Sequence, residues 1–303
     1  MKIIFMGTPE FSVPILEALN DKYEVLLVIS QPNREKKKGV YIDTPVCKCA
    51  KELGLNIIQP ENIKDEYENI KSYNADTLIT AAYGQYIPTK ILNLFKFKLN
   101  VHGSLLPKHR GGAPIQRCLM EGDKITGVTI MEMTKGLDQG KMYCKSEYQI
   151  DDNDNSTTLF NKLSIIGRDL LIDNLDDIYN GKIEGIMQDD SLSTYSSVIK
   201  PDEEEIDIKA SAQEIRNKVR GLAMNPGAYL NIKGIKLKIF DVGIIEDNSN
   251  LEPGYVISTK KGIIIKTGKD SISLLSVLMP GKKIISGKDF SNGQKIFNEG
   301  EII

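Results

Sequence analysis

The sequence predicts an α/β protein in which a doubly wound, Rossmann-like domain precedes a smaller C-terminal β-barrel of OB type. In the first half of the 303 residues, nearly continuous Ile, Leu and Val runs alternate with segments of helical period. This βαβ rhythm is typical of a parallel sheet buried on both faces. Residues 189–208 then lose any apolar period and end in an acidic cluster. Beyond them, short apolar runs separated by glycines predict a small barrel.

In the N-terminal half, each short apolar run predicts a strand and each segment of 3.6-residue period predicts a helix. The expected strands are KIIFMG, EVLLVIS, NIIQP, ADTLITAAY, KLNVHGS, GVTIMEMT and KMYCKSEYQI. The expected helices lie near residues 13–20, 45–53 and 64–73, from residue 114, and over residues 157–179. The first apolar run meets Gly7 and Pro9 too early for a signal sequence, so we expect it to be a buried strand.

The C-terminal part is expected to begin with a helix near residues 210–220. The strand-like segments that follow are GAYLNI, IKLKIFDVGII, GYVISTKKGIIIKTG and SISLLSVLMP. No internal repeat interrupts this pattern. We therefore expect a catalytic domain over residues 1–188, a linker over residues 189–204, and a C-terminal domain over residues 205–303.

Composition excludes several classes of protein. Hydrophobic residues make up 41% and charged residues 26%, the balance of a soluble globular protein. No apolar run approaches the roughly 20 residues that cross a bilayer, so we expect no membrane span. The four cysteines are scattered and predict structural thiols in a reducing cytoplasm. With two histidines in the chain, a His-based metal site is hard to build, and we expect no metal.

The charge is divided unevenly along the chain. The net charge is −2, which argues against a surface that is basic throughout. Residues 205–303 carry 15 Lys and Arg against 11 Asp and Glu, a net +4, which leaves −6 for residues 1–204. This division is a weak indication of a polyanionic partner for the C-terminal part, because a charge difference of this size is more often a solvated surface.

The densest group of polar, potentially catalytic residues follows Leu99. If Leu99–His102 ends a strand, Asn100 and His102 share a face because side chains alternate. The carboxyl ends of strands are where open α/β sheets bind ligands. An amide beside an imidazole suits a reaction that develops negative charge on a carbonyl oxygen. No Ser or Cys here lies in a GxSxG context, so the pair predicts acyl transfer by direct attack of an amine; the alternative is a pair that only hydrogen-bonds a loop end.

A second candidate is the loop over residues 134–140, in which glycines flank Asp138. It lies between two expected strands, and its glycines would let the main chain approach a ligand closely. A carboxylate near His102 would favour the imidazolium form and make the ring a better donor or proton relay. Periodicity leaves open whether this loop reaches His102, and taken alone it is an ordinary turn with a surface acid.

Five segments of the chain occur together and in a fixed order: MGTPEFSVPILEAL, AAYGQYIP, NVHGSLLPKHRGGAPIQ, TGVTIMEMTKGLDQG and MPGKKIISGKDFSNG. The most specific of their elements is SLLPxxRG after the N-x-H pair. On these segments, which run from Met1 almost to the C-terminus, the sequence resembles the folate-dependent formyltransferases, and within them the family of methionyl-tRNA formyltransferases.

The resemblance implies an enzyme of translation initiation. It would transfer the formyl group of 10-formyltetrahydrofolate to the α-amino group of methionine on initiator tRNA. The resemblance implies that Asn100 and His102 stabilise the oxyanion, while Asp138 sets the charge of His102 and helps to move the amine proton. Positioning of the substrates would supply much of the remaining rate.

The resemblance also implies a folate site. It places the co-substrate against the SLLP turn, the Asp138 loop and the main chain of residues 82–87. A pterin combines a flat apolar face with an amide-like edge, which suits an apolar site that offers main-chain donors and acceptors. The implied folate-binding residues are Ser104, Leu105, Leu106, Pro107, Ala82, Tyr83, Gly84, Gln85, Tyr86 and Ile87.

Two segments are implied to contact the tRNA. The turn after the first strand would border the aminoacyl end, and an exposed basic loop over residues 33–39 would contact acceptor-stem phosphates in a salt-dependent way. The family usually has an Arg- and Gly-rich version of this loop, whereas this chain has a shorter, Lys-rich one. The expected tRNA-binding residues are Gly7, Thr8, Phe11, Arg34, Lys36, Lys37 and Lys38.

One alternative shares the same chemistry. An amino-sugar N-formyltransferase uses the same folate donor and the same N-x-H and Asp residues, so the catalytic residues do not separate the two. The basic C-terminal part and the Lys-rich loop favour tRNA. A non-catalytic relative is disfavoured because Asn100, His102 and Asp138 are all present. We expect a cytoplasmic monomer that binds initiator methionyl-tRNA and folate.

Overall fold

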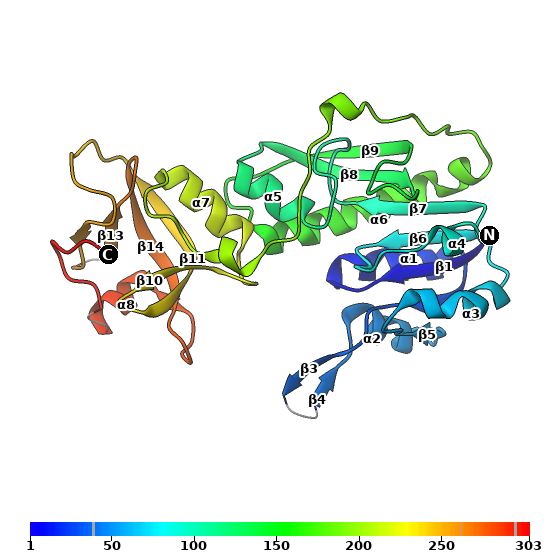
Figure 1. The fold of residues 1–303 in the computed structure, drawn as a ribbon, viewed down its shortest axis with the longest axis horizontal. Coiled ribbons are helices and arrows are strands. Elements are labelled where there is room, and N and C mark those ends of the chain that lie inside the picture. The colour runs from blue at the N-terminus through cyan, green and yellow to red at the C-terminus, as the bar shows by residue number, and fades with distance from the viewer. Residues whose placement is uncertain (38–39, 261, 294–295) are drawn as a thin grey trace. The chain divides into compact units, whose positions relative to one another are not determined.

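A computed structural model of the chain describes residues 1–37, 40–260, 262–293 and 296–303; for residues 36, 37 and 40 it describes the main chain alone. These residues form two compact units (Figure 1). The first unit comprises Met1–Pro114, Ile125–Gln149 and Phe160–Ser197, and the second comprises Ile115–Lys124, Ile150–Leu159 and Val198–Ile303. In the described part of the chain, no helix is both long and apolar enough to cross a membrane.

The first unit is built on a seven-stranded sheet in the order β5-β2-β1-β6-β7-β8-β9. The first five strands in this order are parallel, and β8 and β9 continue the sheet antiparallel. The strands are β1 Lys2–Gly7, β2 Glu24–Ile29, β5 Ile57–Ile58, β6 Thr77–Ala81, β7 Phe97–His102, β8 Ile125–Glu132 and β9 Met142–Gln149. Each strand predicted for this half is present, and the predicted doubly wound α/β fold is confirmed.

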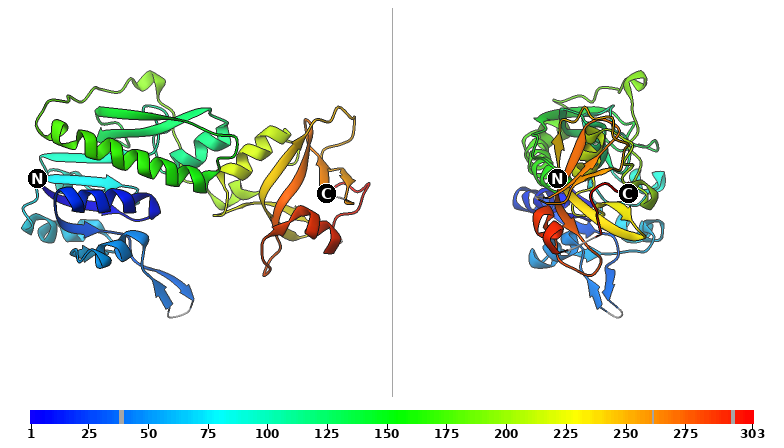
Figure 2. Two further views of the ribbon diagram at one scale, coloured as in Figure 1. Left: turned by 180° about the vertical axis from the view of Figure 1, so that it is seen from behind. Right: turned by 90° about the vertical axis from the view of Figure 1, so that its left-hand side faces the viewer.

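Helices cover both faces of this sheet (Figure 2). Ile4 of β1 packs in one core with Ile70 of α3 and with residues of α4. On the other face, α1 and α6 are joined by a 3.1 Å ion pair between Lys22 and Asp176. Gly167 brings α6 so close to β7 that a Cβ atom there would lie 2.8 Å from Val101. The helices are α1 Val13–Lys22, α2 Pro45–Glu52, α3 Tyr67–Ser72, α4 Thr89–Leu92 and α6 Ser156–Tyr179.

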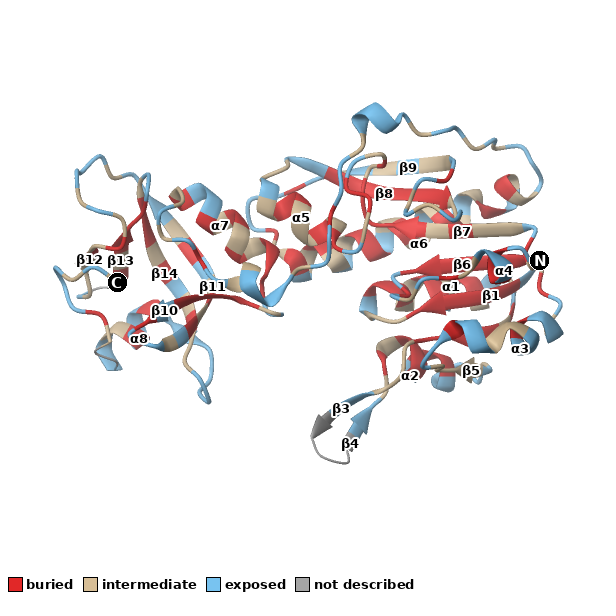
Figure 3. Ribbon diagram, viewed as in Figure 1, coloured by how far each residue is buried: buried red, intermediate tan, exposed pale blue. Residues whose placement is uncertain are grey.

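Burial explains why the strands of this sheet read as continuous apolar runs. Figure 3 shows buried residues along β1, β6 and β8. All five residues of β6 are buried, as are residues 3–7 of β1, whose first residue, Lys2, is exposed. A strand buried on both faces has no polar side, so apolar and polar residues do not alternate along it. Such a strand is recognised in the sequence by the length and the composition of its apolar run.

Residues 34–42 form a two-stranded antiparallel hairpin where the sequence predicts a loop. Its strands are β3 Arg34–Lys37 and β4 Val40–Ile42. The loop prediction is therefore wrong over Arg34–Lys37. The segment REKK has no alternation of apolar and polar residues, and Tyr41 and Ile42 on the paired strand are 65% and 45% exposed. Main-chain pairing holds this hairpin, and because it has no buried face its sequence lacks the pattern that predicts a strand.

The second unit is an antiparallel β domain. Its strands follow the order β10-β11-β14-β13-β12, and β15 pairs with β14. Ile215 and Val219 of α7 and Phe290 of α8 pack with the inward residues of these strands in one core. The strands are β10 Ala228–Ile232, β11 Ile235–Ile245, β12 Val256–Ser258, β13 Ile263–Lys266, β14 Ser271–Leu278 and β15 Ile285–Ser286, and the helices are α5 Pro114–Glu121, α7 Ala212–Gly221 and α8 Gly287–Gly293. The predicted order of an α/β unit before a smaller β unit is confirmed.

Acid sensitivity is expected at an ion pair of the second unit. Arg117 holds both oxygens of Glu203, at 2.6 and 2.9 Å, and these bonds with one from the Lys200 amide lower the pKa of Glu203 to about 2. Because the folded pKa lies below the ordinary 4.5, the stabilisation is present above pH ~4.5 and is lost as pH falls toward 2. Glu203→Gln should lower the free energy of unfolding by about 1–2 kcal/mol at pH 7 after allowance for partial exposure.

Urea unfolding at pH 7 and at pH 3 tests this expectation. The difference between the unmodified protein and Glu203→Gln should shrink at pH 3, because the Glu203 carboxyl is then protonated in the unfolded chain while it stays largely ionised in the folded protein. Asp202→Asn, at the exposed neighbouring position, is the control and should stay within about 0.5 kcal/mol at both pH values. An equal difference at the two pH values would show that the charge of Glu203 is not the cause.

Candidate active site

Asn100 lies in the first unit, near the carboxyl end of β7. It pairs in register with Thr80 of β6, whose hydroxyl donates a 2.8 Å hydrogen bond to Asn100 Oδ1. Because the carbonyl oxygen of the amide accepts this bond, its NH₂ group is turned to the other side. Asn100 is half-buried, so the NH₂ group is a donor that a substrate could reach.

His102 is two residues further along the same face of β7 and is 5% exposed. Its Nε2 lies 2.9 Å from the carbonyl oxygen of His109. Because a carbonyl only accepts, Nε2 carries a proton and Nδ1 is the nitrogen left for chemistry. Nδ1 lies 3.8 Å from Asp138 Oδ2. The structure therefore brings His102 and Asp138 together, at a distance that allows charge interaction and is longer than a hydrogen bond.

The Asp138 loop is held by main-chain contacts. Asp138 has a φ angle of 50°, in the left-handed region, and the amide of Gly111 donates a 2.8 Å hydrogen bond to Oδ2. Gly140 lies so close to β8 that a Cβ atom would come within 1.9 Å of the carbonyl oxygen of Glu132. The glycine at 140 therefore serves close packing of the loop on the sheet.

The SLLP turn is fixed to the sheet by two side chains. The Thr129 hydroxyl donates to Ser104 O at 2.7 Å and accepts from Leu106 N at 3.1 Å. Lys145 of β9 donates to Leu106 O, and burial lowers the pKa of this lysine. Leu106 is fully buried, whereas Leu105 and Pro107 are half-buried. Ser104 and Leu106 thus use main-chain groups to hold the turn, and the side chains of Leu105 and Pro107 remain for a ligand.

Residues 82–87 follow β6 and contrast with the SLLP turn. Ala82, Gly84 and Tyr86 are exposed, whereas Tyr83 and Ile87 are buried. Gln85 uses its side chain within the protein, since Oε1 accepts from Ile63 N at 2.9 Å.

The main chain of this segment is available to a ligand. Over the described residues, the main-chain groups of Gly84, Gln85 and Tyr86 make no hydrogen bond. A pterin edge needs donors and acceptors of this kind, so the segment fits a folate. Tyr83 does not contribute its phenol, because burial raises its pKa and leaves its hydroxyl without a hydrogen bond in the described part of the chain.

The turn after β1 is packed against residues 82–87. The Thr8 hydroxyl donates to Tyr83 O at 2.8 Å, and a Cβ atom at Gly7 would lie 2.7 Å from Ser12 Cβ. Phe11 is 4% exposed, and its ring packs edge-on against Phe160. The structure thus places Thr8 beside the proposed folate segment and places the Phe11 ring in the core.

The basic residues expected to bind tRNA lie at the hairpin. Arg34 is exposed at the start of β3. The side chains of Lys36 and Lys37, and Lys38 as a whole, lie outside the described residues. Their roles stay predictions from the sequence.

Gln188, Asp190 and Ser196 belong to a part of the site that the sequence does not reveal. Arg110 is 1% exposed and bonds Gln188 and Asp190, while His109 Nδ1 lies 2.8 Å from Ser196 Oγ. Arg110 is the arginine of SLLPxxRG, so this motif could have identified it as a site residue. Gln188 and Ser196 lie in a segment without periodicity, 48 or more residues from their partners Gly140 and His109, and no local pattern marks them.

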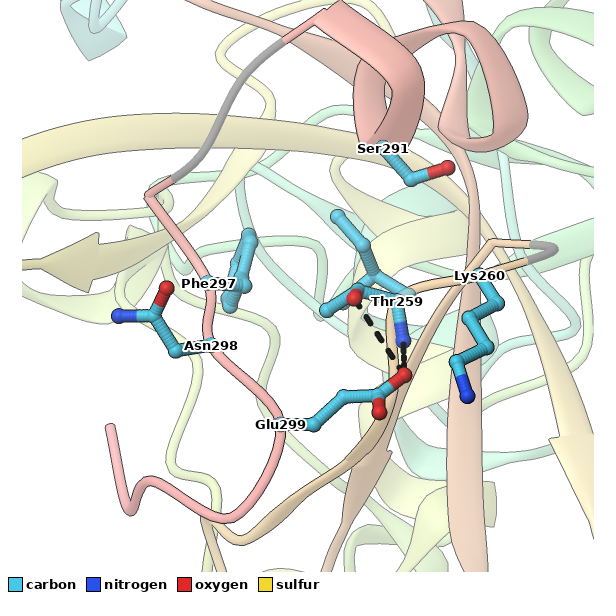
Figure 4. Close-up of a pocket in the computed structure, with 7 residues that line it drawn as sticks. Thr259, Lys260, Ser291, Phe297, Asn298 and Glu299 are labelled. Atoms are coloured by element: carbon cyan, nitrogen blue, oxygen red, sulfur yellow. Dashed lines mark hydrogen bonds between the residues drawn. The ribbon is translucent and has the colours of Figure 1, made fainter.

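A pocket of about 330 Å³ lies in the second unit (Figure 4). The side chain of Glu299 lines this pocket and accepts a 2.8 Å hydrogen bond from Thr259 N. The lining residues are Thr259, Lys260, Ile263, Ser291, Phe297, Asn298 and Glu299, none of them a predicted site residue. Within the part of the chain that the structure describes, no three His, Cys, Asp or Glu side chains cluster so as to hold a metal ion.

An amide, an imidazole and a carboxylate that meet near the carboxyl end of β7 are the groups that acyl transfer by direct attack of an amine requires. Comparison with known families makes this chemistry specific. The model of the formyl transferase family matches residues 1–175, and the model of the formyl transferase C-terminal domain matches residues 198–295. The chain belongs to the formyl transferase family.

Its relatives have a more specific name. The chain is 44% identical over 299 residues to "Methionyl-tRNA formyltransferase" of Streptococcus pyogenes serotype M12 (strain MGAS2096), which covers 97% of this chain and 96% of that protein. It is 43% identical over 298 residues to the protein of the same name from Streptococcus pneumoniae (strain Hungary19A-6), with 96% and 95% covered. A solved structure of an N-formyltransferase from Helicobacter canadensis, with folinic acid and dTDP-3-aminofucose, has the same fold, with a TM-score of 0.67 at 20% identity over 90% of this chain and 99% of that one.

Proposed function

We propose that the chain transfers the formyl group of 10-formyltetrahydrofolate to the α-amino group of methionine on initiator tRNA. The observation that carries this proposal is 44% identity over almost the full length of proteins named methionyl-tRNA formyltransferase. The geometry supports it, because His102 and Asp138 lie 3.8 Å apart beside Asn100. The residues of the first unit can therefore serve the chemistry that the name describes.

The folate co-substrate supplies an electrophilic formyl carbon when it is bound. The main chain of Gly84–Tyr86 and the half-buried side chains of Leu105 and Pro107 would hold it. The NH₂ group of Asn100 donates a hydrogen bond to the formyl oxygen as negative charge develops there. His102 Nδ1 lies 3.8 Å from the Asp138 carboxylate, and its N–H would donate a hydrogen bond to the same formyl oxygen.

Asp138 also receives the proton of the attacking amine. A carbon–nitrogen bond to methionine forms, the bond from the formyl carbon to the folate nitrogen breaks, and the proton passes through Asp138 and His102 to the leaving nitrogen. The site needs no serine or cysteine nucleophile for this sequence.

Labelled formyl transfer tests the proposed function. The purified chain is incubated with 10-formyltetrahydrofolate and, in separate reactions, methionyl-tRNA, uncharged tRNA and a nucleotide-linked amino sugar. Label should appear on methionyl-tRNA alone. Label on the amino sugar, with methionyl-tRNA unmodified, would overturn the proposal in favour of the sugar enzyme.

The division of labour between the domains is also part of the proposal. Residues 1–188 form the catalytic domain, residues 189–204 link it to the rest, and residues 205–303 bind tRNA through their net charge of +4. Gly7 and Thr8 border the aminoacyl end. The protein acts as a monomer in the cytoplasm, where initiator tRNA is charged.

Salt dependence should reveal the role of the Lys-rich segment. If Lys36, Lys37 and Lys38 contact acceptor-stem phosphates, changing all three to Gln should weaken tRNA binding and flatten the slope of log affinity against log salt by roughly 2–3. Single-turnover formylation at saturating tRNA should be unchanged. Lys64→Gln, at an exposed lysine before α3, is the control. An unaltered slope in the triple variant would remove this segment from the interface.

A further inference from the structure

The amide of Gln188 joins two catalytic loops. Its Nε2 donates to Asp138 O and to Gly140 O, both at 2.8 Å. Its Oε1 accepts from Arg110 Nε at 3.0 Å and from Arg110 Nη2 at 2.9 Å. The orientation of the amide follows from chemistry, because a guanidinium only donates and the two carbonyls only accept. Every hydrogen-bonding position of this amide is used.

The contacts close into a ring around Asp138. Gln188 holds its main-chain carbonyl, and the amide of Gly111 holds its carboxylate at 2.8 Å. Gly111 follows Arg110, which is itself bonded to Gln188. The groups that hold the two ends of Asp138 both connect to Arg110, whose side chain is 1% exposed: Gln188 by hydrogen bonds and Gly111 as its neighbour in the chain. Ser196 completes the support, since its amide donates to Arg110 O at 2.6 Å.

We propose that Gln188, which Arg110 holds in place, is a positioning residue that sets the distance between Asp138 and His102. That distance is 3.8 Å, so a shift of less than 1 Å decides whether the two make a hydrogen bond. Asp138 has a left-handed φ angle and would relax without support from outside its own loop. Gln188 supplies this support from a segment remote in sequence, outside the expected catalytic motifs.

Gln188→Glu is the discriminating variant. A carboxylate at 188 would still accept from Arg110 and so would keep the arginine in place. It would lose both donors to the loop and would place a negative charge beside two carbonyl oxygens. The loop over residues 138–140 would therefore move while the fold around Arg110 is retained. Gln188→Met, of similar size and without donors, removes the bridge without adding charge.

The kinetic test compares these variants with Asp189→Asn, a matched change at the exposed adjacent position. Gln188→Glu and Gln188→Met should lower kcat on the order of 10- to 100-fold, with KM for both substrates changed less than about threefold. In the Asp138→Asn background the same changes should cost little more, because Gln188 acts through Asp138. Asp189→Asn should match the native protein. A kcat within twofold of native in both variants, or a full loss that persists in the Asp138→Asn background, would overturn the proposal.

A second measurement does not depend on the acceptor. The inference rests on the proposed function for its substrate, whereas this measurement needs no substrate. Because the chain has two histidines, the nitrogen-15 spectra of its imidazoles are simple to assign with His102→Asn. The Nδ1 resonance of His102 should move in Gln188→Glu and not in Asp189→Asn. An unmoved resonance would sink the positioning role even if formylation is confirmed. A moved resonance in a protein that fails to formylate methionyl-tRNA would leave the positioning role standing and refute only the substrate.

Discussion

Asn100→Ala is expected to lower kcat by about 10²–10³-fold, the typical cost of one lost oxyanion donor. The NH₂ group of Asn100 faces away from Thr80, whose hydroxyl occupies Oδ1 at 2.8 Å, so the amide is oriented before substrate arrives. A donor oriented in advance acts mainly as charge develops in the transition state. Folate affinity, measured by equilibrium fluorescence quenching, should change less than about threefold because the ground state gains little from this bond.

Two variants separate orientation from donation. Asn100→Asp keeps the size and the Thr80 contact but replaces the donor with an acceptor, so it should lose as much activity as Asn100→Ala. Thr80→Val keeps the donor and removes the hydroxyl that orients it, so a loss of roughly 10-fold is expected. Retention of more than a tenth of native kcat by Asn100→Asp would rule out the amide as an oxyanion donor.

The pairing of Asn100 with His102 could be predicted because it is a property of one strand. Alternation along β7 places residues two apart on one face, and the continuous apolar runs around it identify a parallel sheet whose carboxyl edge binds ligands. Both are local signals. The strand that they predict is confirmed, since β7 ends at His102 and pairs in register with β6.

The meeting of His102 with Asp138 could only be conjectured, because its causes are not local. Asp138 reaches the ring by a left-handed turn, a glycine that lies against β8, and the Gly111 amide 27 residues away. None of these contacts leaves a periodic trace. The resemblance to a known family supplied the assignment that spacing alone did not.

The Gln188 bridge and the β3–β4 hairpin are two features that local sequence patterns do not predict, and the reasons differ. The hairpin has regular structure without a buried face, so the alternation that predicts strands is absent from REKK. Gln188 lies in a segment without regular structure that is nevertheless ordered by long-range hydrogen bonds. In both cases polar or main-chain bonds fix the conformation, and hydrophobic periodicity does not detect them.

His102→Ala should lower kcat on the order of 10²-fold or more while folate affinity is retained, because the imidazole acts in the transition state. The ring is positioned by two contacts: Nε2 donates to His109 O at 2.9 Å, and Nδ1 faces Asp138 at 3.8 Å. If Asp138 works by setting the charge of this ring, Asp138→Asn should cost a comparable factor. The two losses should then not add.

The double variant His102→Ala/Asp138→Asn therefore decides between one catalytic unit and two independent groups. A unit predicts a double variant about as slow as the slower single variant, whereas independent groups predict the product of the two losses. Single-turnover rates with methionyl-tRNA provide the comparison, and folate binding to each variant provides the control for folding. Weak folate binding with unchanged turnover in His102→Ala would assign the ring to substrate binding, and the 3.8 Å contact would then have no role in proton transfer.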